Sequence, residues 1–275
     1  MQLTKIYQKK HELWLKILFA SFAISNEKIK SELNDMASIE FRHLKWLSNR
    51  LKSENISYDY EKNEIDIQKA SNFEFFEFLT SEIKELKSEY KTGDALFERI
   101  SSDEEYFLAR LEHFLSKDEF NGEVTAFNRQ RVYEDIKLSK TSTDALTIFL
   151  FEESYKEYEL ILIYAYMQNY TDNIRLYNVY QDLIDESIFH LKCFGQMQAK
   201  MGILAIPRTI IESLYKRADI KKFLTDGIEE EKAAKQECIK LSSAVNNEEL
   251  SKFFDFINYQ ENYHMELMQK ALEVL

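Results

Sequence analysis

Apolar residues recur at alternating steps of three and four along most of this chain of 275 residues, and very little interrupts them. The sequence holds five glycines and a single proline, Pro207. Steps of three and four place side chains on one face of an α-helix, whereas glycine and proline mark helix ends and turns. Long uninterrupted stretches of this kind predict an almost entirely α-helical protein.

Short polar segments divide the periodic stretches into eight helices in four hairpins. These turns are Ser-Asn at 25–26, Lys-Thr-Gly-Asp at 91–94, Tyr-Thr-Asp-Asn at 170–173 and Asn-Asn at 246–247, and several of them offer a helix N-cap. The expected helices span roughly residues 4–24, 27–52, 70–90, 95–116, 144–169, 174–201, 226–244 and 248–273. The first helix includes residues 9–25, whose basic and apolar run is similar to a secretory signal but contains Glu12 and Lys16.

The chain also repeats itself. His-Leu-Lys at 43–45 recurs at 190–192, and the same offset of 147 residues aligns HELWLKI (11–17) with YELILIY (158–164). An offset of 157 residues aligns DEEYFLARL (103–111) with QENYHMELM (260–268). We therefore expect a tandem duplication with one four-helix bundle in residues 1–120 and another in residues 140–275. Segments around 118–142 and 202–210 would form the long connections.

Three of the apolar stripes contain a glutamate and a histidine at core positions. The pairs are Glu40 with His43, Glu186 with His190, and Glu261 with His264. A buried carboxylate without a partner costs several kcal/mol or becomes neutral. A divalent metal ion would let the carboxylates stay ionised and would accept neutral imidazole as a ligand, so these pairs predict metal binding.

Partner helices in a hairpin should offer further glutamates at the same depth. Reflection through the turns selects Glu12, Glu159 and Glu230, with Glu152 and Glu153 left open as alternatives to Glu159. The fourth helix of the first half offers Glu104, but Phe107 stands where the second half has His264. The third helix of the first half offers Glu74, Glu77 or Glu82, none of them on the stripe. We expect a complete site in the second half and a degraded one in the first.

These residues resemble the ferritin-like di-iron carboxylate superfamily, and rubrerythrins in particular. That fold places a glutamate on each of two helices and a Glu-x-x-His motif on each of the other two. The resemblance implies two tandem ferritin-like bundles. It also implies a metal site formed in the second half by Glu159, Glu186, His190, Glu230, Glu261 and His264, with Glu12, Glu40, His43 and Glu104 as the incomplete counterpart.

The resemblance further implies a di-iron centre, with manganese as the alternative metal, that reduces peroxide or activates O₂. Two cysteines cannot form the four-cysteine module that supplies electrons in many rubrerythrins, so the implied partners are a separate electron-donor protein and, in a homodimer, a second copy of the chain. Three alternatives stay open: a non-enzymatic iron-binding or storage protein, a metal-free helical scaffold, and an oxygenase acting on an organic substrate.

Composition excludes several other classes. A net charge of −12 argues against a nucleic-acid-binding protein, because phosphate backbones need a basic surface. No apolar run is long enough to predict a membrane span. The low cysteine count fits a cytoplasmic protein.

Overall fold

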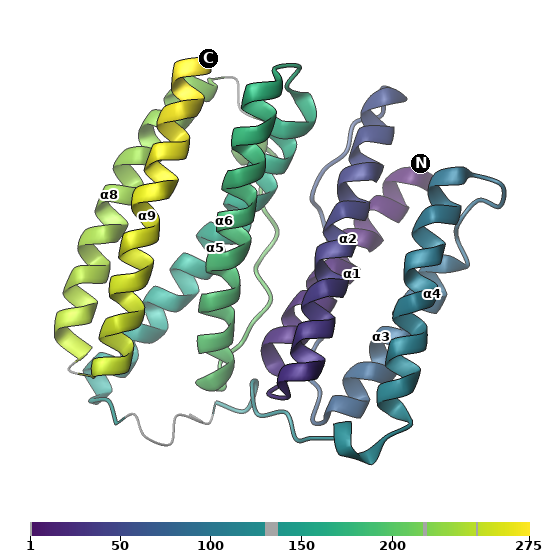
Figure 1. Ribbon diagram of the computed structural model, residues 1–275, viewed down its shortest axis with the longest axis horizontal. Coiled ribbons are helices and arrows are strands. Elements are labelled where there is room, and N and C mark those ends of the chain that lie inside the picture. Colours follow the sequence, from purple (N-terminus) through teal and green to yellow (C-terminus); the bar gives the residue numbers. More distant parts are fainter. Residues whose placement is uncertain (1, 130–136, 217–218, 246) are drawn as a thin grey trace. The chain divides into compact units, whose positions relative to one another are not determined.

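The computed structural model describes residues 2–129, 137–216, 219–245 and 247–275. Within these ranges all long elements are α-helices, and the one strand-like pairing is an isolated antiparallel bridge between Ser71 and Glu123. The prediction of an all-α chain is confirmed (Figure 1). The long helices are α1 (Gln2–Ala23), α2 (Glu27–Ser53), α3 (Asn72–Lys87), α4 (Ala95–Leu115), α5 (Lys140–Tyr170), α6 (Ile174–Lys200), α8 (Ile220–Val245) and α9 (Glu248–Val274), and the short ones are η1 (Asp118–Phe120) and α7 (Glu212–Tyr215).

Polar side chains cap the helices at the predicted turns. Asn26 accepts hydrogen bonds from the backbone N–H groups at the start of α2, and Asp94 and Asn247 do the same for α4 and α9. Gly93 has a φ of 78°, a left-handed conformation that lets the chain reverse just before Asp94. The other asparagine of the last turn, Asn246, lies outside the described residues.

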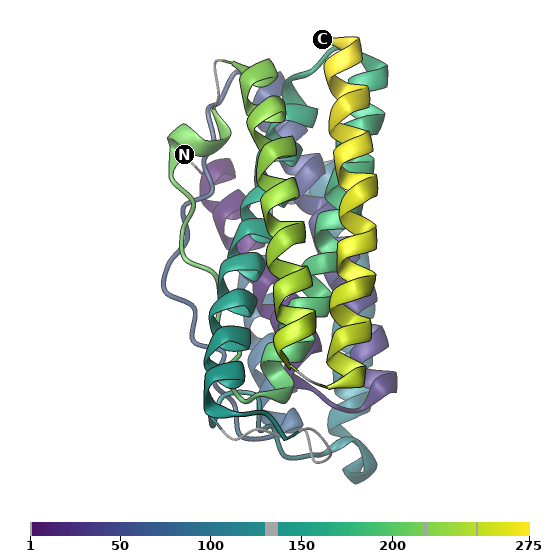
Figure 2. The same cartoon turned by 90° about the vertical axis from the view of Figure 1, so that its left-hand side faces the viewer.

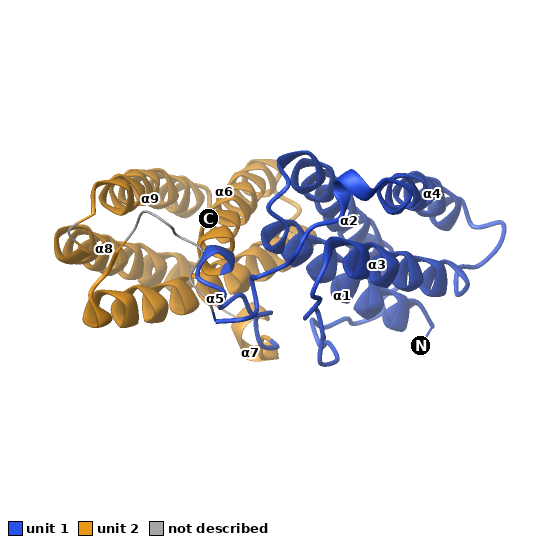
Figure 3. Ribbon diagram, turned by 90° about the horizontal axis from the view of Figure 1, so that it is seen from below, with its two compact units in different colours: residues 1–132, 199–209 blue, residues 133–198, 210–275 orange. Residues whose placement is uncertain are grey.

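The chain divides into two compact units (Figure 3). Unit 1 comprises Met1–Val132 and Ala199–Thr209, and unit 2 comprises Tyr133–Gln198 and Ile210–Leu275. The segment 199–209 belongs to unit 1, although the sequence placed it in the second half. The reason is main-chain pairing, because the N–H of Leu204 donates to the oxygen of Ala126 at 3.0 Å and that of Arg129 to Gly202 at 2.7 Å. Of the expected linker, residues 130–136 lie outside the described residues.

In unit 1, helix α1 lies at the centre. It packs against α2 and α3, and every residue from Lys10 to Phe22 is buried. The long connection after α2 covers its remaining face, where the Tyr7 ring lies 4.9 Å from that of Tyr58. A helix enclosed on all sides tolerates apolar residues around its whole circumference, which explains the signal-like composition of residues 9–25.

In unit 2, helix α5 contacts the other three long helices. The Phe149 ring lies 5.8 Å from Phe194 on α6 and 5.4 Å from Phe254 on α9. Further along α5, Tyr164 lies 6.1 Å from Phe223 on α8. Helices α8 and α9 run side by side (Figure 2). The four helices therefore enclose one core, and hairpins three and four form it together.

None of the described helices is both long enough and apolar enough to cross a membrane.

Candidate metal centre

Helices α5, α6 and α9 bring four polar side chains together in the core of unit 2. The group consists of Glu157, His190, Glu261 and His264, and all four are buried. Each offers one nitrogen or oxygen atom, and these atoms lie within 4.8 Å of one another. Both histidines are fully buried and both glutamates are 2% exposed, so water cannot solvate the carboxylates freely.

The contacts within this group are close. Nδ1 of His190 lies 3.0 Å from Glu157 Oε1 and 3.7 Å from Glu261 Oε1. Nδ1 of His264 lies 3.3 Å from Glu261 Oε2. The two imidazole rings lie 4.9 Å apart, centroid to centroid. Nitrogen and oxygen atoms that could bind a metal thus come together from three helices.

Several atoms of the group make no hydrogen bond within the described part of the chain. They are Oε2 of Glu157 and Glu261, Nε2 of His190 and both ring nitrogens of His264. His264 Nδ1 and Glu261 Oε2 lie close together, but without the geometry of a hydrogen bond. Buried polar atoms without partners each cost about 1–3 kcal/mol, so a compensating group is expected here. A metal ion bound by these oxygen and nitrogen atoms would satisfy them at once.

A third carboxylate adjoins the group from α8. The side chain of Glu231 is buried and hydrogen-bonds with Glu261, and it pairs with Lys156 Nζ at 3.2 Å. Burial, together with the nearby Glu231 and Glu157, raises the pKa of Glu261 to about 10. Without a cation, Glu261 therefore holds a proton at neutral pH. The site has more carboxylates than its own cations can neutralise.

Two other members of the group of four have shifted pKa values. Burial disfavours the ionised form of Glu157, but His190, His264 and Lys156 together outweigh this and lower the pKa of that carboxyl. Burial likewise disfavours imidazolium, but Glu157 and Glu261 together outweigh it and raise the pKa of His190. Glu157 and His190 thus form an ion pair at the edge of the group.

Three further polar side chains surround the group. Glu153 lies one turn before Glu157 on α5, and burial raises the pKa of its carboxyl to about 7. Burial and the carboxylates of Glu231 and Glu157 raise the pKa of the Tyr164 phenol well above its usual value. The hydroxyls of Tyr164 and Ser187 are buried and make no hydrogen bond within the described residues.

The structure assembles only part of the set that the sequence selected for unit 2. His190, Glu261 and His264 lie in the group. Glu159 is half-buried and lies two residues past Glu157, which takes its place. The correction has a geometric cause, because α5 buries residues 150, 154, 157, 161 and 164 in steps of four and three, and residue 159 is off that face.

The same argument from helix faces explains why two other predicted ligands, Glu230 and Glu186, lie outside the group. Glu230 is exposed, and its neighbour Glu231 is buried in a heptad with Leu224, Cys238 and Val245. Glu186 is half-buried and does not join the group. The buried position one turn before His190 is instead Ser187, so α6 contributes no glutamate.

Of the alternatives that the sequence left open on α5, Glu152 is exposed and Glu153 is half-buried. Neither belongs to the group of four, although the carboxylate of Glu153 interacts with those of Glu157 and Glu231.

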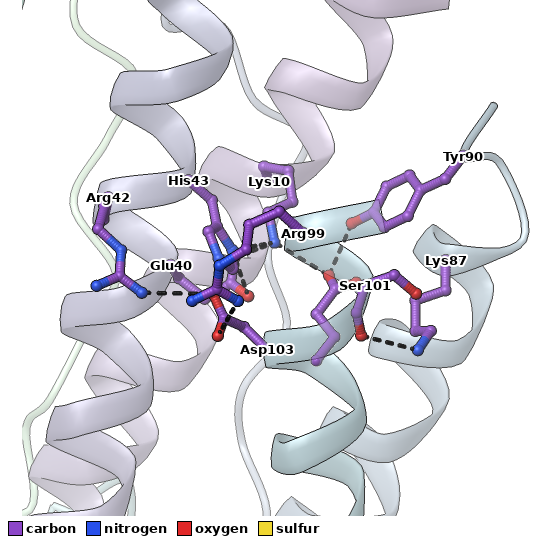
Figure 4. A network of polar contacts seen from close by, with 10 residues as sticks. Lys10, Glu40, Arg42, His43, Lys87, Tyr90, Arg99, Ser101 and Asp103 are labelled. Carbon is purple, nitrogen blue, oxygen red and sulfur yellow. Dashed lines mark hydrogen bonds and ion pairs between the residues drawn. The ribbon is translucent and has the colours of Figure 1, made fainter. Parts of the chain in front are cut away.

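Unit 1 contains a different buried cluster of polar side chains (Figure 4). Lys10 on α1 points between α2 and α4 and pairs with Glu40. Its Nζ lies 3.0 Å from Glu104 Oε1 and 3.2 Å from His43 Nδ1. All four side chains are completely buried. The sequence selected Glu40, His43 and Glu104 as metal ligands but missed the lysine between them.

The cluster extends on both sides through hydrogen bonds. His43 Nε2 lies 3.0 Å from Asp103, which also pairs with Arg99 at 2.6 Å and Arg42 at 3.3 Å. The hydroxyl of Tyr90 donates to Glu104 at 2.7 Å. Burial disfavours ionisation of Glu40, but Lys10 is the strongest of the groups that oppose this effect, and the pKa of that carboxyl is lowered. Burial and the neighbouring Glu40 raise the pKa of Glu104.

The remaining candidates of the first half lie elsewhere. Glu12 accepts hydrogen bonds from the backbone and side chain of Asn63 at 2.8 and 2.9 Å and lines a surface cavity of about 220 Å³. It faces the connection after α2, so the structure does not bring it together with Glu40, His43 and Glu104. On α3, Glu74 caps its own helix start, Glu77 is exposed and Glu82 pairs with Lys16.

Comparisons with family models, with curated proteins and with solved structures find no match for this chain. The chemistry of the two clusters is therefore the basis for any functional conclusion.

Proposed function

We propose that unit 2 binds a redox-active transition metal, iron or manganese, and uses it to reduce peroxide or activate O₂, as the resemblance to ferritin-like di-iron proteins implies. The observation that supports this most directly is the buried group of two glutamates and two histidines with donor atoms lacking hydrogen bonds. Carboxylate and imidazole ligands suit iron, manganese and zinc better than calcium or magnesium.

The residues present fit one ion. Glu157, His190, Glu261 and His264 would hold it, and Glu231 would supply a further carboxylate beside them. The family set has six ligands, and this chain has serine at position 187 where a sixth carboxylate would be expected. We therefore propose a metal centre with five protein ligands and open positions for an oxygen-containing substrate.

When bound, the metal would supply the electrons that reduce peroxide or O₂. The protein's own groups have three tasks. The carboxylates neutralise the cation, the imidazoles fix its position, and the surrounding apolar side chains exclude water.

Proton supply is the remaining requirement, since peroxide reduction to water consumes two protons for every two electrons. Glu153 is suited to deliver them, because its pKa of about 7 leaves it partly protonated at neutral pH. It is half-buried and lies one turn from Glu157, between solvent and the core. The electrons would come from a separate donor protein.

The test is anaerobic loading with Fe(II), followed by addition of H₂O₂ or O₂ in a stopped-flow instrument. The expected result is uptake of one or two ions per chain and their rapid oxidation. The Glu261→Ala/His264→Ala variant should lose both uptake and oxidation. The matched control is Glu159→Ala/Glu230→Ala, which removes two glutamates outside the group and should behave like the unaltered chain.

The same experiment separates the rival functions. Oxidation of many ions per chain, accompanied by a large oligomer, would favour iron storage. No uptake of Fe(II) or Mn(II), together with thermal stability that does not respond to metal, would favour a metal-free scaffold. Oxidation that is equal in the chain and in the Glu261→Ala/His264→Ala variant would contradict the proposed centre.

A further inference from the structure

Unit 1 buries a cluster with the same residue spacing as the group in unit 2. Lys10 and His43 are 33 residues apart in the chain, as are Glu157 and His190. The offset of 147 residues relates Lys10 to Glu157, and the offset of 157 relates Glu104 to Glu261. Both clusters are buried, and each joins the first, second and fourth long helices of its unit. The two clusters therefore occupy equivalent positions in the repeat.

At one of these equivalent positions the two units differ, because unit 1 has Lys10 where unit 2 has Glu157. The ammonium group of lysine has three N–H donors and no acceptor. In unit 1 these donors face Glu40, Glu104 and His43, which are the groups that would otherwise bind a cation. The ammonium nitrogen thus lies between the side chains that could otherwise bind a cation.

The contacts of His43 also indicate that Lys10 occupies the place of a cation. Because Lys10 can only donate, Nδ1 of His43 must accept, and the ring proton must be on Nε2, which then donates to Asp103 at 3.0 Å. A histidine bound to a metal has the same arrangement, with one nitrogen on the cation and the other donating to a carboxylate. His43 is therefore oriented as a ligand, with an ammonium group in place of the metal.

We propose that the ammonium of Lys10 takes, in unit 1, the position of a divalent cation, and that replacing Lys10 with glutamate opens a metal site formed by residues 10, 40, 43 and 104. In the unaltered chain, unit 1 binds no divalent cation, because Coulomb repulsion from a buried charge and the loss of ligand atoms to Lys10 both oppose it. This inference concerns unit 1 alone, and its test does not depend on any activity of unit 2.

The two tryptophans of the chain provide a selective signal. Both Trp14 and Trp46 lie in unit 1, and the Trp46 ring lies 5.4 Å from that of His43. Co(II) bound beside His43 should quench Trp46 fluorescence and give visible absorption bands. All measurements use the full chain carrying Glu261→Ala/His264→Ala, so that unit 2 does not compete for the ion.

With Lys10 in place, this background chain should bind no Co(II) that quenches tryptophan. Adding Lys10→Glu should produce uptake of one Co(II) per chain with quenching. The matched control is Lys9→Glu, which makes the same charge change at a half-buried neighbour that pairs with Glu85 and Glu89. We expect Co(II) binding at least roughly 100-fold tighter in Lys10→Glu than in Lys9→Glu, and its loss on addition of His43→Ala.

Two results would overturn the proposal. One is tryptophan quenching by Co(II) in the background chain, which would show that Lys10 does not exclude the ion. The other is a folded Lys10→Glu chain, judged by circular dichroism, that takes up no Co(II). If Lys10→Glu is unfolded without metal, Co(II) must restore its helix content. Should it fail to do so, the folded Lys10→Ala chain is measured instead, and absence of Co(II) uptake there also overturns the proposal.

Discussion

Unit 1 and unit 2 each bury glutamate and histidine side chains among their helices, but they balance the charge differently. In unit 1, the ammonium group of Lys10 contacts Glu40, His43 and Glu104, so the protein itself supplies the cation. In unit 2, Lys156 pairs with Glu231, which adjoins the group, from a more exposed position. In unit 1 the cation that contacts the carboxylates is a side chain of the protein, whereas in unit 2 we propose that a metal ion takes this role.

The comparison shows that two helical cores with similarly spaced polar residues can place different groups beside their buried carboxylates. Buried carboxylates are expensive in either unit, so each cluster is expected to have a cation or a proton near them. Replacing a ligand by lysine keeps the remaining glutamates ionised without a metal. The same glutamate and histidine pattern therefore marks a structural ion-pair network in one half and a candidate metal centre in the other.

The largest expected effect comes from removing the internal cation. Lys10→Met should lower the free energy of unfolding of unit 1 by about 3–5 kcal/mol, because it leaves two buried carboxylates without their partner. The measurement is urea unfolding followed by tryptophan fluorescence, which reports unit 1. Lys9→Met is the control at the adjacent, half-buried position, where we expect a loss of about 1 kcal/mol or less because its ion pairs are partly solvated. A Lys10→Met loss below about 1 kcal/mol would contradict the assigned role.

The next largest effect should come from metal removal, and it should appear in unit 2 only. A ligand present at 1,000 times its dissociation constant stabilises the folded state by about 4 kcal/mol. Addition of a chelator to Mn(II)-loaded protein should therefore lower one thermal transition seen by circular dichroism and leave the tryptophan transition unchanged. A chelator that shifts both transitions equally would show that the units do not differ in this way.

A pH effect should distinguish the units further, through a histidine of unit 1 that lies outside the cluster. Burial, and to a lesser extent Lys62, lowers the pKa of His11 to about 3, below its unfolded value of 6.5. The unfolded chain binds more protons between these values, so this contribution to stability is present above pH 6.5 and is lost as pH falls through the window. Its loss between pH 7 and pH 5 is about 2 kcal/mol.

The check is unfolding of the His11→Phe chain by urea at pH 7 and pH 5, followed by tryptophan fluorescence. Phenylalanine keeps an aromatic ring beside Trp14 and Tyr60 but cannot be protonated. The variant should lose less stability than the unaltered chain on acidification. An equal loss in both proteins would exclude His11 as the source.

The smallest expected effect is the most discriminating within unit 2. Glu231→Gln should weaken Mn(II) binding by roughly tenfold or more, since its carboxylate adjoins Glu261. The neighbouring Glu230→Gln should change the affinity less than about twofold and the stability by about 0.5 kcal/mol or less, as for most exposed positions. Isothermal titration with Mn(II) measures both, and the reverse order of effects would contradict the assignment of residue 231.

Much of this architecture could be predicted from the sequence, because helix periodicity and capping are local properties. Asn26, Asp94 and Asn247 begin helices where the polar turns indicated. His190, Glu261 and His264 could be identified because each interrupts an otherwise apolar stripe. Whether a metal binds them stays a prediction.

The predicted and observed residues differ where the choice depended on helix register, that is, on which of two nearby residues faces the core. Reflection through a turn gives depth to within a residue or two, but a shift of one residue rotates a side chain by about 100° around the helix. Reflection through the turns therefore pointed to Glu159 and Glu230, whereas the structure buries Glu157 and Glu231. The heptad from Leu224 to Val245 would have identified Glu231. Lys10 was missed because lysine is ordinarily a surface residue, although the repeat aligned it with Glu157.

The most direct test of this account is anomalous diffraction from crystals of the full chain grown with Mn(II). We predict a peak in unit 2 between Glu157, His190, Glu261 and His264, and none near Lys10. A peak between Lys10, Glu40 and Glu104, or no peak in unit 2 at saturating Mn(II), would contradict it.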